Sequence, residues 1–450
     1  MAQQIPADIS PNIRRDSIKR FLGASLISKL VSLAVPFVVA PLAIRVLGEL
    51  YAAHVALFGM ASILTTANLG VGPALSFKIT KYAAKSNPEE ESKWFSSGLM
   101  ANLLTGSLLS LIVLLAAFFL DPVMIYGGAL KDFRSALTSG TIYLAAFCLF
   151  YGASNAIANM FIGYLQEYRV IFSITLSQAF IILATAPLLH AYPYVLTYLI
   201  LTSASAIIFQ VGAGVVLVKK WKPHLQVAYK LVEFARVKKL LVENTLQSFS
   251  GLGYIISRQV TLLMLSAMSL SHIAVGIAGT LTVLHGPYSG LLTMFASAVL
   301  PTLSNARDEK DAGWIWRTTR RLLLILPAIV IVATVVLYFF GPMATKFLYQ
   351  EYALDATESV LLGLMGASTG LLVICNAYSQ AFGKFALNGF SGIVHAGIGL
   401  LGGFLLMPTY GVKGYAVAWI VAETTAAIVI AAVARKQIIA EIATWTSSDS

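Results

Sequence analysis

The stretch FSSGLMANLLTGSLLSLIVLLAAFFL, residues 95–120, contains 26 consecutive residues without a charged side chain. An α-helix needs about 20 mostly apolar residues to cross the hydrocarbon core of a bilayer. Eleven further runs are mostly apolar and of similar length. They cover residues 21–44, 51–75, 137–163, 171–189, 194–218, 242–265, 273–300, 322–341, 358–382, 386–407 and 412–434. The sequence therefore predicts an all-α polytopic membrane protein with twelve transmembrane helices.

The composition agrees with this class and excludes several others. Of the 450 residues, 58% are hydrophobic and 11% are charged, against about 45–50% and about 25% in a soluble domain. Cys148 and Cys375 both lie in apolar runs, and neither a disulfide framework nor a metal-ligand pattern is visible. A secreted disulfide scaffold, a nucleic-acid-binding domain and a disordered chain are excluded.

The distribution of Lys and Arg predicts the orientation. With a cytoplasmic N-terminus and twelve spans, 24 of the 31 Lys and Arg residues fall on the cytoplasmic side and five on the opposite side. The remaining two, Lys29 and Arg258, lie inside spans. A missed or added span would exchange the sides of every later loop, so the separation favours both the number twelve and cytoplasmic termini. The first span follows a basic segment without a cleavage pattern, and we interpret it as retained.

The long basic loop 219–241 divides the twelve runs into six and six. We expect a cytoplasmic segment 1–20, a six-helix bundle 21–218, the linker 219–241, a second six-helix bundle 242–434 and a cytoplasmic tail 435–450. Two short matches indicate a duplication: Pro73-Ala74-Leu75-Ser76 resembles Pro301-Thr302-Leu303-Ser304, and Pro187 corresponds to Pro408. Repeats with an even number of spans are related by a pseudo-twofold axis along the membrane normal.

The linker 219–241 has an apolar periodicity of its own. Leu231, Phe234, Val237 and Leu241 recur at helical spacing among basic residues, which predicts an amphipathic helix on the anionic cytoplasmic leaflet. A topology signal without a surface helix explains the same charges equally well.

The chain carries no motif of an enzyme. A nucleophile elbow, a metal-binding His/Glu helix and a phosphate-cradling Gly loop are all missing from the sequence. We therefore predict a protein that is not an enzyme, has no metal site and needs no cofactor.

Several short motifs carry a family resemblance. Arg45-Val46-Leu47-Gly48, then Asn68-Leu69-Gly70-Val71-Gly72-Pro73-Ala74-Leu75, resemble the first spans of the polysaccharide transporter family. This family, which includes the Wzx-like repeat-unit flippases, belongs to the multidrug/oligosaccharidyl-lipid/polysaccharide (MOP) exporter superfamily. Val299-Leu300-Pro301-Thr302-Leu303-Ser304 and Tyr410-Gly411-Val412-Lys413-Gly414-Tyr415-Ala416 resemble its second half. The resemblance covers essentially the whole chain.

The resemblance implies a fold, a location and a function. The fold would be that of the MATE and MOP transporters, in a bacterial inner membrane. The function would be to flip undecaprenyl-diphosphate-linked oligosaccharides to the periplasmic leaflet by alternating access, for O-antigen, capsule or exopolysaccharide synthesis. A proton or cation gradient, or the membrane potential, would drive the step, and a polysaccharide polymerase and a chain-length regulator would be partners. A MATE-type cation-coupled multidrug antiporter is the alternative. The first span favours the flippase, because it carries Lys29 and no acidic residue.

Two cations inside spans are the candidate diphosphate ligands. A charge at the bilayer centre costs roughly 2.5–3.5 kcal/mol on the insertion scale, so it needs a reason. Arg258 offers a planar fork and Lys29 a mobile point charge for a diphosphate, and we expect both to line the cleft between the halves. Snorkelling of Lys29 to the interface, or its pairing with a carboxylate, is the alternative.

Other polar residues inside spans suggest coupling. Glu423 could bind and release a proton or cation, and His285 and His395 could relay protons. A structural ion pair for Glu423 and hydrogen-bonded core positions for the two histidines are the alternatives.

Amides and prolines suggest sugar binding and gating. Asn68, Asn155, Asn159 and Gln247 could hydrogen-bond sugar hydroxyls, and bonds between helices are the alternative. Asn155 and Asn159 are four residues apart and share one helical face. Pro36 and Pro41 each remove a backbone donor from the first span, so we expect that span to kink and to bend during opening.

Overall fold

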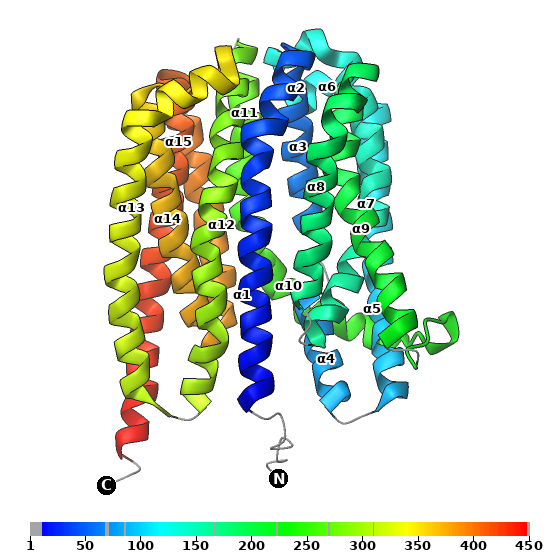
Figure 1. The fold of residues 1–450 in the computed structure, drawn as a ribbon, viewed down its shortest axis with the longest axis vertical. Helices are drawn as coiled ribbons and strands as arrows, with labels where there is room; N and C mark the ends of the chain where they lie inside the picture. The colour runs from blue at the N-terminus through cyan, green and yellow to red at the C-terminus, as the bar shows by residue number, and fades with distance from the viewer. Residues whose placement is uncertain are drawn as a thin grey trace. The chain divides into compact units, whose positions relative to one another are not determined.

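A computed structural model describes residues 11–67, 72–84, 87–164, 167–221, 224–268, 271–308, 310–382 and 384–447. Within these ranges the chain is helical almost throughout and has no β-strand (Figure 1). The first half contains α1 (Pro11–Ala34), η1 (Val35–Val39), α2 (Ala40–Leu47), α3 (Leu50–Ala67), α4 (Gly72–Ala84), α5 (Pro88–Phe119), α6 (Pro122–Tyr126), η2 (Gly128–Phe133), α7 (Arg134–Gly163), α8 (Glu167–Ala191) and α9 (Val195–Trp221). The second half contains η3 (Tyr229–Leu231), α10 (Phe234–Ile255), η4 (Ile256–Val260), α11 (Thr261–Met268), α12 (His272–Asp308), α13 (Ala312–Tyr349), η5 (Gln350–Tyr352), α14 (Ala356–Ala381) and α15 (Phe385–Ser447).

The helices have the length and polarity of membrane spans. In the described residues, eight are long and apolar enough to cross a bilayer, and two shorter apolar helices cover Leu50–Thr65 and His272–Gly286. Helix α15 holds the two last predicted runs and breaks between them, where Gly411 has a φ of +54°. The prediction of an all-α polytopic membrane protein is confirmed, and all twelve predicted runs lie on helices where they are described.

Local sequence explains where the spans begin. Helix α5 starts at Pro88, a residue suited to the first helical turn, and the Asn87 side chain accepts a hydrogen bond from the Glu90 amide. Helix α14 starts with a capping box, in which Asp355 and Glu358 each accept the other's backbone N–H.

Two spans contain a π-helical turn. In the first span η1 lies between α1 and α2, and in the seventh span η4 lies between α10 and α11. Pro36 accounts for η1 because it has no N–H for the helical ladder, whereas η4 contains no proline and carries Arg258 instead. Pro41 is the second residue of α2. The bending of this span during opening stays a prediction.

By its contacts the chain forms two units, and their boundaries differ from those of the two expected six-helix bundles. Unit 1 consists of Met1–Leu42, Leu64–Leu120 and Thr138–Thr245. Unit 2 consists of Ala43–Ile63, Asp121–Leu137 and Leu246–Ser450. The first span thus passes from unit 1 to unit 2 directly after η1 and Pro41. The predicted domain boundaries stay a prediction.

Unit 1 has its core around α4, α5, α7 and the start of α10. Helix α8 packs on α9 and α1, and α4 packs on α5. The core is built from large buried side chains of these helices, among them Leu75, Ile79, Trp94, Phe95, Met160 and Phe161.

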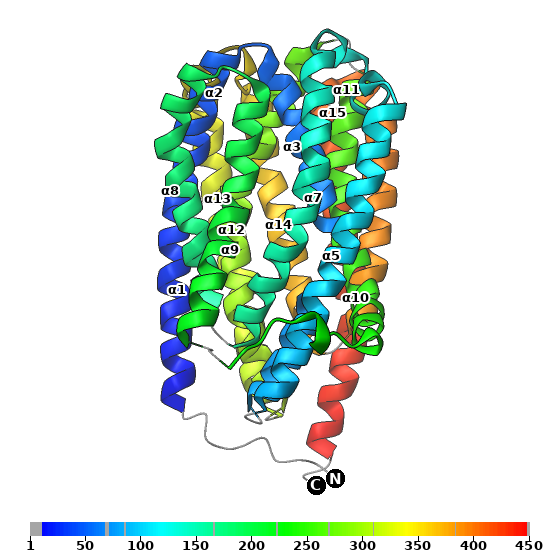
Figure 2. The same cartoon turned by 90° about the vertical axis from the view of Figure 1, so that its right-hand side faces the viewer.

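The linker 219–241 docks on unit 1. Figure 2 shows its extended part crossing the end of α5, where Ser92 and Ser96 donate hydrogen bonds to the carbonyls of His224 and Gln226. Helix α10 then begins at Phe234, whose side chain is 76% exposed, while Val237 and Leu240 are buried in the core of unit 1. Of the predicted apolar face, Val237 thus lies in the core and Leu241 packs against it, and contact of Phe234 with a membrane surface stays a prediction.

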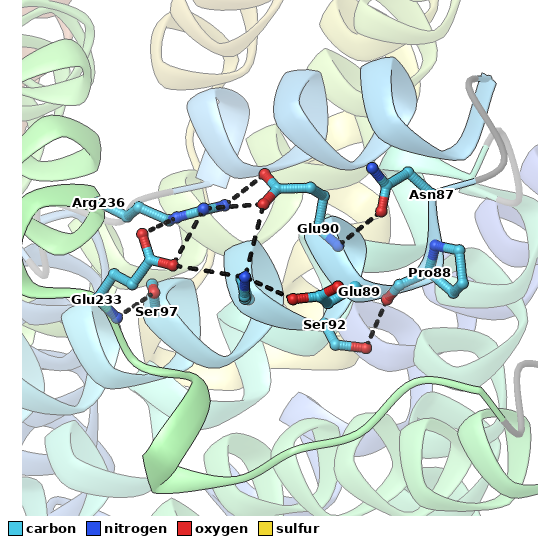
Figure 3. A network of polar contacts seen from close by, with 9 residues as sticks. Asn87, Pro88, Glu89, Glu90, Ser92, Ser97, Glu233 and Arg236 are labelled. Carbon is cyan, nitrogen blue, oxygen red and sulfur yellow. Dashed lines mark hydrogen bonds and ion pairs between the residues drawn. The ribbon is translucent and has the colours of Figure 1, made fainter.

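An ion-pair network fastens the linker to α5 (Figure 3). The Arg236 guanidinium donates two hydrogen bonds to Glu90, of 2.7 and 3.0 Å, and also binds Glu233. Lys93 pairs with Glu89 at 2.6 Å. The hydrogen bonds from Arg236 to Glu90 raise the pKa of Arg236 above its usual value, so the pair stays charged.

Unit 2 packs four long helices side by side. Helix α14 contacts α12, α13 and α15, as Figure 1 shows. Two segments of the first half, Ala43–Ile63 and Asp121–Leu137, complete this unit. They hold large side chains in full burial, including those of Tyr51 and Tyr126.

Candidate functional site

The seventh and twelfth spans meet in an intramembrane ion pair. Nη2 of Arg258, in the π-helical turn η4, binds Oε1 of Glu423, in α15. The Glu423 side chain is 0% exposed and that of Arg258 is 24% exposed. The two residues that sequence analysis assigned to substrate binding and to coupling therefore form one group. The pairing that was left open for Glu423 is present.

The second carboxylate oxygen of Glu423 is also fully engaged. Ser368 and Thr369, both buried in α14, donate hydrogen bonds of 2.7 and 2.6 Å to Oε2. The Thr369 hydroxyl lies 3.0 Å from Nε2 of His285 on α12. Two hydroxyl donors and an arginine stabilise the charged form of this carboxylate in a place where an unpaired charge would be very costly.

Arg258 keeps hydrogen-bonding capacity after it has bound Glu423. Its guanidinium lies over the Trp419 ring, 4.8 Å from the ring centroid, and its Nε has no hydrogen-bond partner among the described residues. A guanidinium carries five N–H donors. Arg258 therefore has donors that Glu423 does not use, although its unpaired Nε is buried.

His395 is fully buried in unit 2. Its ring meets Tyr254 edge-on at 4.8 Å between centroids, and Tyr254 in turn bonds Ser391 at 2.7 Å. The His285 ring meets Trp419 in the same way at 4.7 Å. Both histidines are buried, and both interact electrostatically with Glu423 and Arg258. Their part in proton transfer stays a prediction.

Lys29 belongs to unit 1 and lies on α1, half-buried. Among the ion pairs that the described residues form, none includes Lys29. Its carbonyl accepts a hydrogen bond from Ser32 within the helix. Of the two predicted diphosphate ligands, Arg258 is thus paired, whereas Lys29 forms no ion pair with another described residue.

Unit 1 contains a ladder of three amides. Nδ2 of Asn159 donates to Oδ1 of Asn155 at 3.0 Å, and Nδ2 of Asn155 donates to Oδ1 of Asn102 at 3.2 Å. Asn102 lies on α5 and is fully buried, whereas Asn155 and Asn159 lie on one face of α7. The expected common face is confirmed. Hydrogen bonds between the helices use part of the capacity that was assigned to sugar binding.

Two predicted sugar-binding residues cannot be placed. Asn68 lies outside the described residues, and Gln247 lies on α10 with its side chain outside them.

Sequence reasoning missed the partners of the candidate residues. Two polar groups are completed by residues that were not predicted: Ser368, Thr369 and Trp419 beside Arg258 and Glu423, and Asn102 beside Asn155. Hydroxyls and aromatic rings occur throughout the spans, so their presence alone gave no signal. Trp419 and Glu423 are four residues apart and therefore lie on one face of α15. This spacing is the sequence signal that could have placed Trp419 beside Glu423.

In unit 2, segments from the first half of the chain pack closely on helices of the second half. A Cβ on Gly279 of α12 would lie 2.6 Å from the side chain of Val55 on α3. The backbone of Gly127, with a φ of +94°, approaches Ala267 so closely that a Cβ would lie 2.5 Å from its nitrogen. A Cβ would require the neighbouring side chain to change at Gly279, and at Gly127 it would meet backbone in a conformation that favours glycine.

The arrangement of the helices defines the fold class of this protein, which is that of the MATE and MOP transporters. Solved MATE transporters share the fold. An inward-facing multidrug resistance MATE transporter of the MOP superfamily aligns with a TM-score of 0.68 and 17% identity over 92% of this chain and 98% of its own. The eukaryotic MATE transporter AtDTX14 aligns with a TM-score of 0.72 and 11% identity over 95% and 96%. A MOP superfamily transporter from Pyrococcus furiosus, described as having a binding pocket of reverse polarity, aligns with a TM-score of 0.64 and 17% identity over 95% and 96%.

The sequence itself gives the family. Residues 20–307 match the family described as "Polysaccharide biosynthesis protein", and the chain belongs to this family. A comparison with curated protein sequences gave no match. The resemblance stated from the motifs is thus confirmed at the level of the family, and the expected fold is confirmed as well.

Proposed function

We propose that the protein flips undecaprenyl-diphosphate-linked oligosaccharides from the cytoplasmic to the periplasmic leaflet of a bacterial inner membrane. The polysaccharide-biosynthesis family and the MOP-type fold support a transporter that serves polysaccharide synthesis. A saccharide built on a lipid carrier in the cytoplasm has to cross the membrane before a polymerase can extend it outside. A polymerase and a chain-length regulator are therefore the partners that we expect.

The charge of the intramembrane groups carries the proposal. The interior of the spans contains two cations, Arg258 and Lys29, and one carboxylate, Glu423. This excess of positive charge suits a diphosphate, which accepts hydrogen bonds from a guanidinium fork and attracts an ammonium. The amides of Asn155 and Asn159 offer further donors and acceptors that fit sugar hydroxyls.

The same charges argue against a pump for cationic drugs. Such a pump needs acidic residues along the drug's path, but the run from Phe21 to Leu47 contains Lys29 and Arg45 and no carboxylate. The Pyrococcus furiosus transporter, described as having a pocket of reverse polarity, is a precedent within this fold for a pocket that differs in charge from those of other members.

Alternating access explains the packing of unit 2. In the orientation predicted from Lys and Arg, Val55 and Gly127 lie near the periplasmic side. Their contacts with second-half residues then close this side of the membrane, and release of the substrate requires them to separate. A proton or cation gradient, or the membrane potential, would drive the cycle without a cofactor.

Transport in proteoliposomes tests the proposal. Purified protein is reconstituted with a fluorescent undecaprenyl-diphosphate oligosaccharide, and appearance of the oligosaccharide on the far leaflet is followed with an impermeant enzyme that cleaves it. We expect transport that an excess of unlabelled undecaprenyl diphosphate slows and that a cationic dye does not. Export of the dye without movement of the lipid would establish the multidrug antiporter instead.

A further inference from the structure

The Arg258–Glu423 pair leaves one question for the proposed flippase. A guanidinium that binds a diphosphate inside the membrane already has an anion, the Glu423 carboxylate. Because Glu423 is wholly buried and Arg258 is partly exposed, a substrate reaches this ion pair at the arginine and not at the carboxylate.

A diphosphate on Arg258 weakens its bond to Glu423. Two anions beside one guanidinium repel each other in a medium of low dielectric constant. The remaining ligands of Glu423 are the hydroxyls of Ser368 and Thr369, and neutral donors alone do not balance a buried charge. A buried carboxylate that loses its cation takes up a proton.

The surroundings of Glu423 provide places for that proton. His285 on α12 touches the Thr369 hydroxyl, so a hydrogen-bonded path runs from its Nε2 through Thr369 Oγ1 to Glu423 Oε2. A proton from solution first converts His285 to an imidazolium; this gives its Nε2 proton to the Thr369 hydroxyl while the hydroxyl proton of Thr369 passes to Glu423, and His285 is left neutral. The other titratable or charged groups near Glu423 are Arg258 on η4, and His395 and Tyr415 on α15 itself.

We propose that the Glu423 carboxylate is an internal anion that competes with the substrate diphosphate for Arg258, so that binding of the diphosphate is accompanied by protonation of Glu423. The inference rests on the proposed function. In the empty protein Glu423 neutralises Arg258, and in the loaded protein the diphosphate replaces it. The linkage is reciprocal, because a proton on Glu423 frees Arg258 for the diphosphate.

Binding of undecaprenyl diphosphate tests this competition. The affinity of the full-length protein in nanodiscs is measured between about pH 6 and about pH 8 for the wild type and for Glu423→Gln. The phosphate groups titrate equally in both experiments, so the ratio of the two affinities isolates Glu423. We expect Glu423→Gln to bind more tightly than the wild type at the upper end of this range, with a ratio that grows by up to about tenfold per pH unit.

Two further variants separate this effect from a structural one. In Ser368→Ala/Thr369→Val every charge remains, but the carboxylate is held less firmly and should yield Arg258 more readily. We expect tighter binding at about pH 8, whereas damage to the site would weaken it. Glu441→Gln removes the carboxylate that binds Arg307 at 2.7 Å elsewhere in unit 2, and it should leave the affinity and its pH dependence unchanged.

The possible results are distinct. If the wild type binds no undecaprenyl diphosphate, the proposed function fails. If the wild type binds it, but Glu423→Gln binds no more tightly at any pH, the competition is wrong and the proposed function stands. If Ser368→Ala/Thr369→Val weakens binding, the competition is equally wrong.

Discussion

Arg258 shows what a charge inside a span requires. It was singled out because a cation in an apolar run is costly, and the structure gives it a carboxylate 165 residues further along the chain. The cost and the position could be predicted from sequence. The partner could not, because no local rule connects residues so far apart. Glu423 was interpreted as a coupling residue or a structural partner, and it is placed for both.

The amides of unit 1 illustrate the opposite limit. Their helical spacing predicted a common face for Asn155 and Asn159, and this is confirmed. Asn102, the third member of the ladder, lies on a different helix and had no such signal. Whether the face binds sugar depends on its unused donors and acceptors, and this can be tested.

At the residue scale we predict that Asn155→Ala/Asn159→Ala weakens transport of the complete lipid-linked oligosaccharide by about 10- to 100-fold, because two hydrogen bonds to sugar are lost. Binding of undecaprenyl diphosphate without sugar should stay at the wild-type level. Transport rates and lipid affinities are compared in the same vesicles. The matched control is Ser177→Ala/Ser205→Ala, which removes another polar contact of unit 1, of 3.2 Å. An equal loss in this control, or no loss in the asparagine variant, would remove the amides from the sugar path.

At the scale of elements, the first span combines a π-helical turn, Pro41 and the passage between the two units. The prolines predicted a deformed helix, and η1 is its form. The matching turn η4 could not be predicted, because Ile256–Val260 contains neither proline nor glycine. π-Helical turns are frequent at functional sites, and η4 carries Arg258.

The linker shows how tertiary packing overrides a local pattern. Its periodicity predicted one amphipathic helix on a membrane. The structure instead uses Val237 and Leu240 for the core of unit 1 and holds Arg236 between Glu90 and Glu233. The basic residues that indicate topology thus also fasten the linker to α5, a role that charge counting cannot reveal.

The packing of α3 on α12 gives a prediction at this scale. In Val55→Cys/Gly279→Cys the two Cβ atoms lie about as far apart as in a disulfide, because a Cβ on Gly279 lies 3.3 Å from that of Val55. We expect oxidation to link them readily and to reduce transport to background, and reduction to restore it. Cys148 and Cys375 are replaced by alanine beforehand, and cross-linking is read on a gel after cleavage between the two positions.

The same sample provides its own control, because the oxidised and reduced forms differ only in the bond. A fully cross-linked protein that transports at the reduced rate would show that α3 and α12 stay together throughout the cycle. The contact would then be structural and not part of a gate.

For the whole molecule, the membrane class and the helical runs could be predicted from composition and apolar run length alone, because the bilayer imposes both. The two contact units could not. Residues 43–63 and 121–137 belong to unit 2 although they come from the first half of the chain, and sequence similarity between the halves carries no information about such packing.

The central claim is that the protein transports a lipid diphosphate through contact with Arg258. The direct test is Arg258→Gln/Glu423→Gln, which removes both charges together and leaves no buried charge unpaired. Its control is Arg307→Gln/Glu441→Gln, because Arg307 likewise pairs with a carboxylate and lies over an aromatic ring, that of Phe382. Both variants are first shown to insert and to melt as the wild type does.

The measurement is the rate at which reconstituted protein flips an undecaprenyl-diphosphate oligosaccharide. We predict that the wild type and Arg307→Gln/Glu441→Gln flip it at similar rates, and that Arg258→Gln/Glu423→Gln is slower by about 10- to 100-fold, as expected for the loss of a charge-assisted contact. Flipping at the wild-type rate by Arg258→Gln/Glu423→Gln would contradict the account.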